Sequence, residues 1–325
     1  MSNKKNILIR ADSSSQIGLG HLMRTLLLAQ GLKKYFHIIF AARELPGSQN
    51  ALITQHGFAL QMVKTMECEE LLEITNKLHP TLCIIDHYGI DQSCEAKIQK
   101  ICDVLAFDDE FKQHSANIVL NHSFIAKTED YSYLHDTKIL AGSHYTLLKD
   151  AFFSHTNRFV PLETLKGKKV LITLGGSDPL NLSLRVKQYL LSIEKSMCVT
   201  IVTTSANARL AHLKAVDKEL IVDADDMARL MRGYDLIITS ASTSLLETFA
   251  LQKPFIAIQC ASNQAQTVDI LTRMGLHNMI RDFTPASLTR ALNFVQYHPQ
   301  KIKCALERYS FRKNGAAQEI IDEYR

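Results

Sequence analysis

Residues 6–21 have the sequence NILIRADSSSQIGLGH, in which a short apolar run is followed by a polar loop that contains two glycines. The apolar run predicts a buried strand over residues 6–9. The amphipathic pattern after the loop predicts a helix over residues 22–33. A strand that passes through a loop into a helix is the repeating unit of parallel α/β sheets.

The same alternation continues along the chain. Apolar runs predict strands over residues 37–41, 81–86, 104–108, 168–174, 199–203, 236–239 and 255–259, and amphipathic segments predict helices over 67–77, 92–100, 182–191, 226–232, 244–251 and 268–275, with two more helices from Pro285 onward. A less regular stretch near 114–161 divides this pattern. We therefore expect two Rossmann-like α/β domains, residues 1–155 and 156–325, that face each other across a cleft. The last helices are expected to belong to the second domain.

The composition is that of an ordinary globular protein, with 325 residues of which 46% are hydrophobic and 22% are charged. The formal net charge of +4 comes without a basic run, which disfavours a nucleic-acid partner and suits a small anionic substrate. Because no apolar stretch has the length of a signal core or a membrane span, we expect a cytoplasmic protein with no membrane partner. A self-contained two-domain cleft is plausible in a monomer.

Seven cysteines are scattered over the chain, and none of them form a CxxC pair. We expect buried, reduced thiols rather than a zinc site or a disulfide framework. No acidic cluster stands out as a metal-binding cage, so we expect a site without a metal ion or a cofactor.

The first loop contains part of a dinucleotide-binding motif, Gly18-x-Gly20, but Met23 stands where the third glycine would be. No acidic residue ends the second predicted strand, where a ribose partner would be expected. NAD binding is therefore disfavoured. The two glycines are better explained by a close approach of the backbone to another ligand.

His21 stands at the start of the predicted helix, where the partial positive charge of a helix N-terminus favours a neutral imidazole. A general base must be neutral in this way. Arg24 lies one turn further along the same face and could bind an anion, and the loop residues Asp12 and Ser13 should face the cleft. On chemistry alone, a catalytic His21 and a His21 that only caps or lines the helix are equally good interpretations.

A second polar group follows the strand predicted over residues 81–86. Asp86 ends this strand and His87 and Tyr88 follow it directly, so the end of the strand would bring these residues into the same cleft as His21. The acidic run 108–110 ends the next predicted strand, where helix capping or a solvated loop explains it at least as well as a role in the site. A turn with a buried tyrosine is the alternative explanation.

The second half of the chain has a candidate phosphate site of its own. Gly175, Gly176 and Ser177 follow the strand predicted over residues 168–174, without the lysine of a P-loop. The start of the helix predicted over residues 244–251 carries small hydroxyl residues that would form an anion site with free backbone N–H groups: Ser240, Ser242 and Ser244.

Three further residues complete this candidate nucleotide site. Glu247 lies one turn into the helix and could accept hydrogen bonds from both hydroxyls of a ribose, and Asn263 and Gln264 open the next helix. Taken singly, a surface carboxylate and a helix cap explain these residues. Their order and spacing together favour nucleotide binding.

These motifs resemble those of a known family. The run from Thr239 to Gln264 is similar to the donor half of GT-B nucleotide-sugar enzymes, which include the MurG-like glycosyltransferases. The earlier motifs resemble the signature of the UDP-sugar hydrolases of pseudaminic acid biosynthesis: RADSS (10–14), IGLGHLMR (17–24), IDHYGI (85–90), FDDE (107–110) and GGSD (175–178). The resemblance covers about residues 6–275.

The resemblance implies an inverting hydrolase that splits UDP-2,4-diacetamido-2,4,6-trideoxy-β-L-altropyranose into UDP and the free sugar. It places the family's catalytic histidine on His21, its active-site tyrosine on Tyr88, its cleft asparagine on Asn263 and its ribose-binding glutamate on Glu247. Two alternatives stay open. One is a glycosyltransferase of the same fold, in which the base deprotonates an acceptor hydroxyl, and the other is a nucleotide-sugar sensor without turnover.

Overall fold

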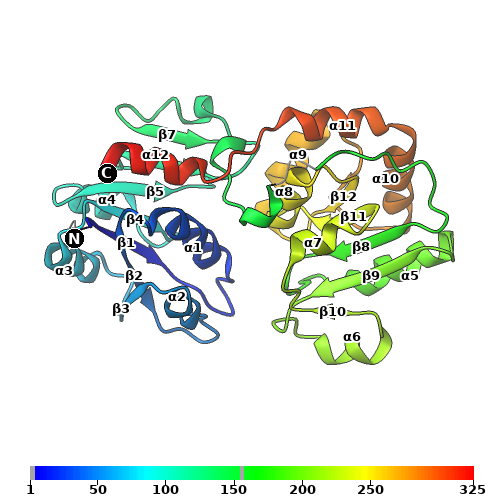
Figure 1. Ribbon diagram of the computed structural model, residues 1–325, viewed down its shortest axis with the longest axis horizontal. Helices are drawn as coiled ribbons and strands as arrows, with labels where there is room; N and C mark the ends of the chain where they lie inside the picture. Colours follow the sequence, from blue (N-terminus) through cyan, green and yellow to red (C-terminus); the bar gives the residue numbers. More distant parts are fainter. Residues whose placement is uncertain (1–3, 154–156) are drawn as a thin grey trace. The chain divides into compact units, whose positions relative to one another are not determined.

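The structure is a computed structural model that describes residues 4–153 and 157–325. The chain forms two compact units, which are described separately (Figure 1). Unit 1 comprises Met1–Leu148 and Phe311–Arg325, and unit 2 comprises Lys149–Ser310. Each unit is built on a sheet of parallel strands, which confirms the predicted α/β class with two Rossmann-like domains.

Unit 1 contains a seven-stranded sheet in the order β3-β2-β1-β4-β5-β6-β7. Its strands are β1 (Asn6–Ala11), β2 (His37–Arg43), β3 (Ala59–Val63), β4 (Leu82–Asp86), β5 (Asp103–Phe107), β6 (Ile118–Asn121) and β7 (Lys138–Ala141). Its helices are α1 (Gly20–Leu32), α2 (Ala51–Gln55), α3 (Cys68–Leu78), α4 (Gln92–Ile98) and α12 (Gly315–Tyr324), with 3-10 turns η1 (Thr128–Tyr131) and η2 (Ser143–Tyr145). The stretch that looked irregular in the sequence supplies β6 and β7.

The apolar runs of the sequence are explained by a sheet that is covered on both faces. Ile7 and Ile9 of β1 pack in one core with residues of α1 and α12, whereas Leu8 packs in a second core with residues of α3 and α4. Successive side chains of a strand point to opposite faces, so a strand between two layers of helices must be apolar throughout.

The last helix corrects the expected domain boundary. α12 packs on α1 so closely that a Cβ added to Gly31 would lie 2.6 Å from the Cβ of Ala317. The chain thus returns to unit 1, where α12, drawn in red, lies among the blue and cyan elements (Figure 1). The expectation that residues 156–325 form one domain is wrong for Phe311–Arg325, because this long-range helix pair has no local sequence signal. The expected division at 155/156 lies outside the described residues.

Unit 2 contains a six-stranded sheet in the order β10-β9-β8-β11-β12-β13. Its strands are β8 (Lys169–Thr173), β9 (Cys198–Thr203), β10 (Ile221–Val222), β11 (Leu236–Ser240), β12 (Phe255–Ile258) and β13 (Met279–Ile280). Its helices are α5 (Ser183–Ile193), α6 (Leu210–Val216), α7 (Met227–Arg232), α8 (Thr243–Ala250), α9 (Ala265–Arg273), α10 (Pro285–Tyr297) and α11 (Pro299–Arg308), with 3-10 turns η3 (Asp150–Phe152) and η4 (Ser262–Gln264). Three helices, rather than the expected two, lie between Pro285 and the end of the chain.

Both sheets reverse their strand order at equivalent places. The reversal lies between β1 and β4 in unit 1 and between β8 and β11 in unit 2. Ligands of such sheets bind beyond the carboxyl ends of the strands at this reversal. The loops that follow these four strands carry most of the predicted site residues.

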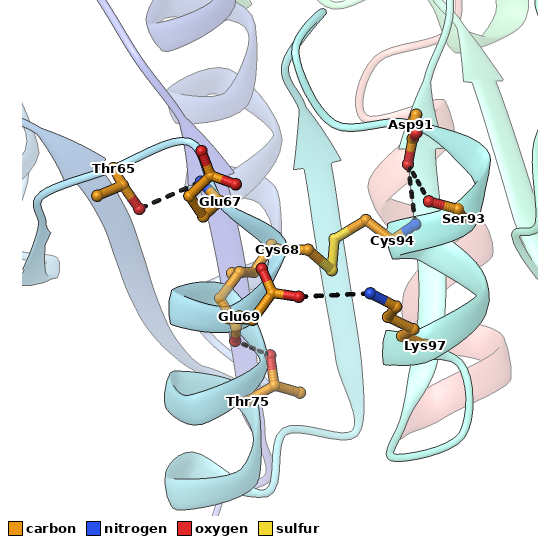
Figure 2. The surroundings of a disulfide bond; sticks show 10 residues. Thr65, Glu67, Cys68, Glu69, Thr75, Asp91, Ser93, Cys94 and Lys97 are labelled. Atoms are coloured by element: carbon orange, nitrogen blue, oxygen red, sulfur yellow. Dashed lines mark hydrogen bonds and ion pairs between the residues drawn. A yellow bond between two sulfur atoms is a disulfide. The ribbon is translucent and has the colours of Figure 1, made fainter.

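A disulfide joins Cys68 at the start of α3 to Cys94 in the first turn of α4, with their Cα atoms 5.5 Å apart (Figure 2). The expectation of reduced thiols is wrong for this pair. The two residues are 26 positions apart in the sequence, and only the packing of α3 beside α4 brings them together. Two of the free cysteines, Cys198 and Cys304, are exposed rather than buried.

Candidate active site

His21 lies in the first turn of α1, at the strand-order reversal of unit 1. Its Nδ1 is 2.5 Å from Oδ1 of Asp86, the last residue of β4. Because an ionised carboxylate only accepts hydrogen bonds, Nδ1 carries the proton and the Nε2 lone pair is free to accept another. The imidazole lines a cavity of about 190 Å³. A histidine that a carboxylate orients in this way can act as a general base.

Arg24 keeps Asp86 ionised. Burial would raise the pKa of the Asp86 carboxyl, but the charge and hydrogen bonds of Arg24, together with the hydrogen bond from His21, lower it to about 2. Arg24 donates to both carboxylate oxygens, with Nε 2.6 Å from Oδ2 and Nη2 2.5 Å from Oδ1. Asp86 is therefore a charged acceptor for His21 at neutral pH.

Tyr88 covers one side of His21. The two rings meet edge to face, with centroids 4.7 Å apart. The Tyr88 hydroxyl donates to the carboxylate of Asp109 at 3.0 Å, and Nη1 of Arg24 is 3.1 Å from the same carboxylate. Burial and the charge of Asp109 raise the pKa of Tyr88, so its hydroxyl stays protonated. One guanidinium thus links the carboxylates that hold His21 and Tyr88.

His122 completes the surroundings of Arg24. Its Nε2 accepts a hydrogen bond from Nη1 of Arg24 at 3.3 Å. Burial and the nearby charge of Arg24 lower the pKa of His122 to about 4, so this ring is neutral. The sequence suggested that Arg24 could bind a ligand anion. In the structure, its guanidinium is instead occupied inside unit 1 by Asp86, Asp109 and His122.

Asp12 is also occupied within unit 1. Burial would raise its pKa, but hydrogen bonds from His87 and Arg10 hold it far below its ordinary range. Nε of Arg43 donates to the same carboxylate at 2.7 Å. His87 donates to Asp12 from Nε2 at 3.0 Å, since its Nδ1 accepts from the N–H of Gly89. Both nitrogens of His87 are used, so His87 and Asp12 shape the cavity wall and neither is a second free base.

The remaining predicted residues of this loop have backbone roles. Ser13 is buried, and its Oγ accepts a hydrogen bond from the N–H of Gln49 at 3.0 Å, which ties the loop to the segment after β2. Gly18 has a φ of +82°, which a side chain would strain. A Cβ at Gly20 would meet nothing within 4 Å, so the start of α1 stays open.

Unit 2 contains a cavity of about 370 Å³ that is lined by four of the nine predicted nucleotide residues, Gly175, Gly176, Ser244 and Glu247. The other five do not line it: Ser177, Ser240, Ser242, Asn263 and Gln264. Gly175 has a φ of +81°. A Cβ at Gly176 would lie 2.8 Å from Oγ1 of Thr204, so a side chain there would force Thr204 to move. These glycines bring the backbone after β8 to the edge of the cavity.

Glu247 is the most informative side chain of this cavity. Burial raises its pKa to about 7, and the charge of Lys149 offsets this only in part. The carboxylate accepts no hydrogen bond from the described part of the chain. A half-buried carboxylate that lacks a donor is costly in the free protein and suits a ligand that presents hydroxyl groups.

The other predicted residues of unit 2 differ in their hydrogen-bond partners and in their exposure. Ser240 and Ser242 hydrogen-bond to each other through their Oγ atoms at 2.7 Å. Gln264 accepts a hydrogen bond from the N–H of Cys260 at 2.8 Å and thereby shapes the turn after β12. Ser177 and Asn263 are exposed.

Asp86 ends β4 and lines the cavity of His21, where the sequence placed it. Asp109 lies two residues beyond the end of β5 and borders neither cavity. Several residues that line the two cavities were not among the predicted site residues. They come from different segments of the chain: Ile17 from the loop after β1, Arg43 from the end of β2 and Met66 from the loop after β3 in unit 1, and Thr204, Asp225 and Met227 from the segments after β9 and β10 in unit 2. Of these residues, only Ile17 belongs to a motif of the sequence.

Within residues 4–153 and 157–325, no group of three or more His, Cys, Asp or Glu side chains could hold a metal ion. A membrane-spanning helix would have to be longer and more apolar than any helix in that described part of the chain.

The comparisons with known proteins agree with this architecture. No family model matches the chain. The chain is similar to the spinosyn rhamnosyltransferase SpnG (12% identity over 98% of this chain and 100% of that one, TM-score 0.67) and to MurG of Acinetobacter baumannii (13% over 99% of both chains, TM-score 0.63), and these likenesses show a GT-B fold. It is 34% identical over 278 residues to the UDP-2,4-diacetamido-2,4,6-trideoxy-β-L-altropyranose hydrolase of Campylobacter jejuni subsp. jejuni serotype O:2, which covers 83% of this chain and 97% of the relative. With this identity over nearly the whole relative, the chain belongs to the family of the UDP-2,4-diacetamido-2,4,6-trideoxy-β-L-altropyranose hydrolases.

Proposed function

We propose that this protein hydrolyses a UDP-linked 2,4-diacetamido-2,4,6-trideoxy-L-altrose to UDP and the free sugar, as a cytoplasmic step toward pseudaminic acid. The observation that carries the proposal is the His21–Asp86 pair, which leaves Nε2 of His21 free at the cavity of about 190 Å³. The name of the Campylobacter relative, a hydrolase of the UDP-linked diacetamido sugar, supports the same substrate.

In the proposed reaction, a water molecule attacks the anomeric carbon from the face opposite UDP, and Nε2 of His21 takes its proton. The bond from the anomeric carbon to the β-phosphate oxygen breaks, and its electron pair leaves with UDP. The configuration at the anomeric carbon inverts. UDP is a good leaving group, so a base without a general acid suffices, which is half of the usual inverting scheme. Asp86 stabilises the imidazolium that forms.

Unit 2 binds the UDP moiety in this proposal. Glu247 accepts hydrogen bonds from the two ribose hydroxyls, which supplies the donors that its carboxylate lacks. The diphosphate lies against backbone N–H groups of the Gly175–Ser177 turn and of the start of α8, where Ser240, Ser242 and Ser244 add hydroxyl groups. Asn263 and Gln264 contribute from the turn after β12. No metal or cofactor takes part.

The remaining groups of unit 1 position the sugar and the water. The protonated Tyr88 hydroxyl and the ring that packs against His21 are suited to orient the sugar. Asp12 and His87 act through the cavity wall, because their polar atoms are already paired.

The decisive experiment follows the reaction by NMR with the purified protein, the UDP-linked diacetamido sugar and EDTA, in the absence of an acceptor. The expected result is release of UDP with an inverted initial anomer. His21→Ala should abolish most of this turnover, while His56→Ala, which changes an exposed histidine of the same unit, should not. Binding without turnover would contradict the proposal and favour a glycosyltransferase or a nucleotide-sugar sensor instead.

A further inference from the structure

The exposed large apolar side chains of unit 1 gather at one edge of its sheet. They lie in the loop after β1, at the end of β3 and just beyond it, and in the loop after β4: Ile17, Leu19, Met62, Met66 and Tyr88. This is the edge at which His21 lies. Exposed apolar groups that border a ligand-binding cavity mark a recognition surface, and Leu19 and Met62 do not border it.

Three of these side chains line the cavity of His21. Ile17, Met66 and Tyr88 are 40%, 48% and 52% exposed, and each borders the cavity. The carboxylates and the imidazole of His87 in the same wall are paired with one another or with arginines. The cavity therefore offers a ligand one free basic nitrogen and an apolar wall.

This wall is held by its surroundings. The sulfur of Met66 packs against the loop that carries Tyr88, and a Cβ at Gly89 would lie 3.2 Å from it. The disulfide between Cys68 and Cys94 joins the helices that begin directly after these two segments (Figure 2). A recognition surface that is fixed before binding discriminates ligands better than one that must be ordered.

We propose that Ile17 and Met66 form a specificity wall that selects the methyl groups of the sugar, namely those of its acetamido substituents and of its deoxygenated C6. The inference rests on the proposed function and names the residues that would recognise this substrate class. An acetylated, 6-deoxy sugar presents methyl groups where common hexoses present hydroxyls. A methyl group that packs against this wall leaves water with a favourable free energy of transfer. A hydroxyl in the same place would lose its hydrogen bonds to water without finding a partner.

The test compares two substrates and three variants. The substrates are the UDP-linked 2,4-diacetamido sugar and its 2,4-diformamido analogue, which keeps the amides and lacks their methyl groups. The variants are Met66→Gln and Ile17→Asn, with Met62→Gln as a matched control, because Met62 is similarly exposed but does not border the cavity. Product inhibition by UDP and the melting temperature are measured for each protein.

Wild-type protein should prefer the acetylated substrate by at least about tenfold in kcat/KM, the usual effect of a methyl group in an apolar pocket. Met66→Gln and Ile17→Asn should lower that preference mainly by raising KM for the acetylated substrate, with unchanged UDP inhibition, and Met62→Gln should match wild type. The proposed specificity wall would be wrong if both cavity variants kept the wild-type preference for the acetylated substrate. It would also be wrong if Met62→Gln lost that preference to the same extent. A wild-type protein that releases no UDP would overturn the proposed function and the wall with it.

Discussion

Replacing Glu247 with glutamine should stabilise unit 2 at alkaline pH. The substitution keeps the shape of the side chain and removes a charge that burial disfavours. The pKa of Glu247 rises from its ordinary value of 4.5 to about 7 in the folded protein. The unfolded chain therefore loses this proton at lower pH than the folded chain, and stability falls as pH rises from about 4.5 to about 7.

The size of the effect follows from this difference. Each pH unit between the two pKa values is worth about 1.4 kcal/mol, so the ionised carboxylate costs about 3 kcal/mol at pH 8. At pH 5 the cost is below about 1 kcal/mol, since the folded carboxyl is still protonated and pH 5 lies only slightly above the ordinary pKa of 4.5 that applies to the unfolded chain. For a unit of this size, the pH 8 value corresponds to a rise in melting temperature of about 6–12 °C.

Ligand binding should respond in the opposite sense. If the ionised carboxylate accepts the ribose hydroxyls, the affinity for uridine should fall about tenfold for each pH unit below about 7. Uridine is the suitable probe because it has no phosphate that titrates in this range. Glu247→Gln should bind uridine weakly at every pH and show a flat profile.

Thermal melts and uridine titrations at pH 5 and pH 8 measure both effects. Glu163→Gln is the control, because Glu163 is an exposed carboxylate of the same unit. A stabilisation by Glu247→Gln that is equal at both pH values would show that the charge of Glu247 is not the cause. A uridine affinity that is independent of this substitution would remove the ribose assignment.

Four further outcomes are expected. His21→Ala should lower kcat by about 10²–10⁴ with UDP affinity retained, and near-normal turnover in a steady-state assay would exclude His21 as the base. Asp86→Asn should also lower kcat by at least about 10², because the carboxylate that orients the imidazole is lost, and an unchanged rate would show that this contact is only structural. Arg24→Met should destabilise unit 1 by about 3–5 kcal/mol in urea unfolding, since it leaves two carboxylates without their cation, and adding Asp86→Asn should recover part of the loss. Replacing Cys68 and Cys94 with serine should cost about 3 kcal/mol, and titration of denatured, unreduced protein should find five thiols, whereas seven would show that the disulfide is absent.

The local sequence pattern was sufficient to predict a residue's place wherever that place depends only on its own strand or helix. The apolar runs predicted β1, β4, β8 and β11 because a strand between two helical layers has no polar face to display. The parallel order of such strands then brings their following loops to one edge of each sheet, which is why residues as distant as His21 and Tyr88 could be assigned to one place.

The hydrogen-bond partners of the residues in the candidate site were harder to predict from the sequence. Arg24 looked available for an anion, and only the packed structure shows that Asp86, Asp109 and His122 surround its guanidinium. Charge and position on a helix do not reveal whether a long side chain meets solvent or a buried acid, because that depends on neighbours from other strands.

The sequence by itself determined the two parallel α/β units, the loops that carry the chemistry and, through its motifs, the hydrolase family. Tertiary structure alone decided that α12 returns to unit 1, that Cys68 and Cys94 pair, and which nitrogen of His21 is free. The physical reason is the range of the interactions involved. Hydrophobic periodicity is written within a few consecutive residues, whereas helix packing, disulfide pairing and buried ion pairs join residues that are brought together only after the chain has folded.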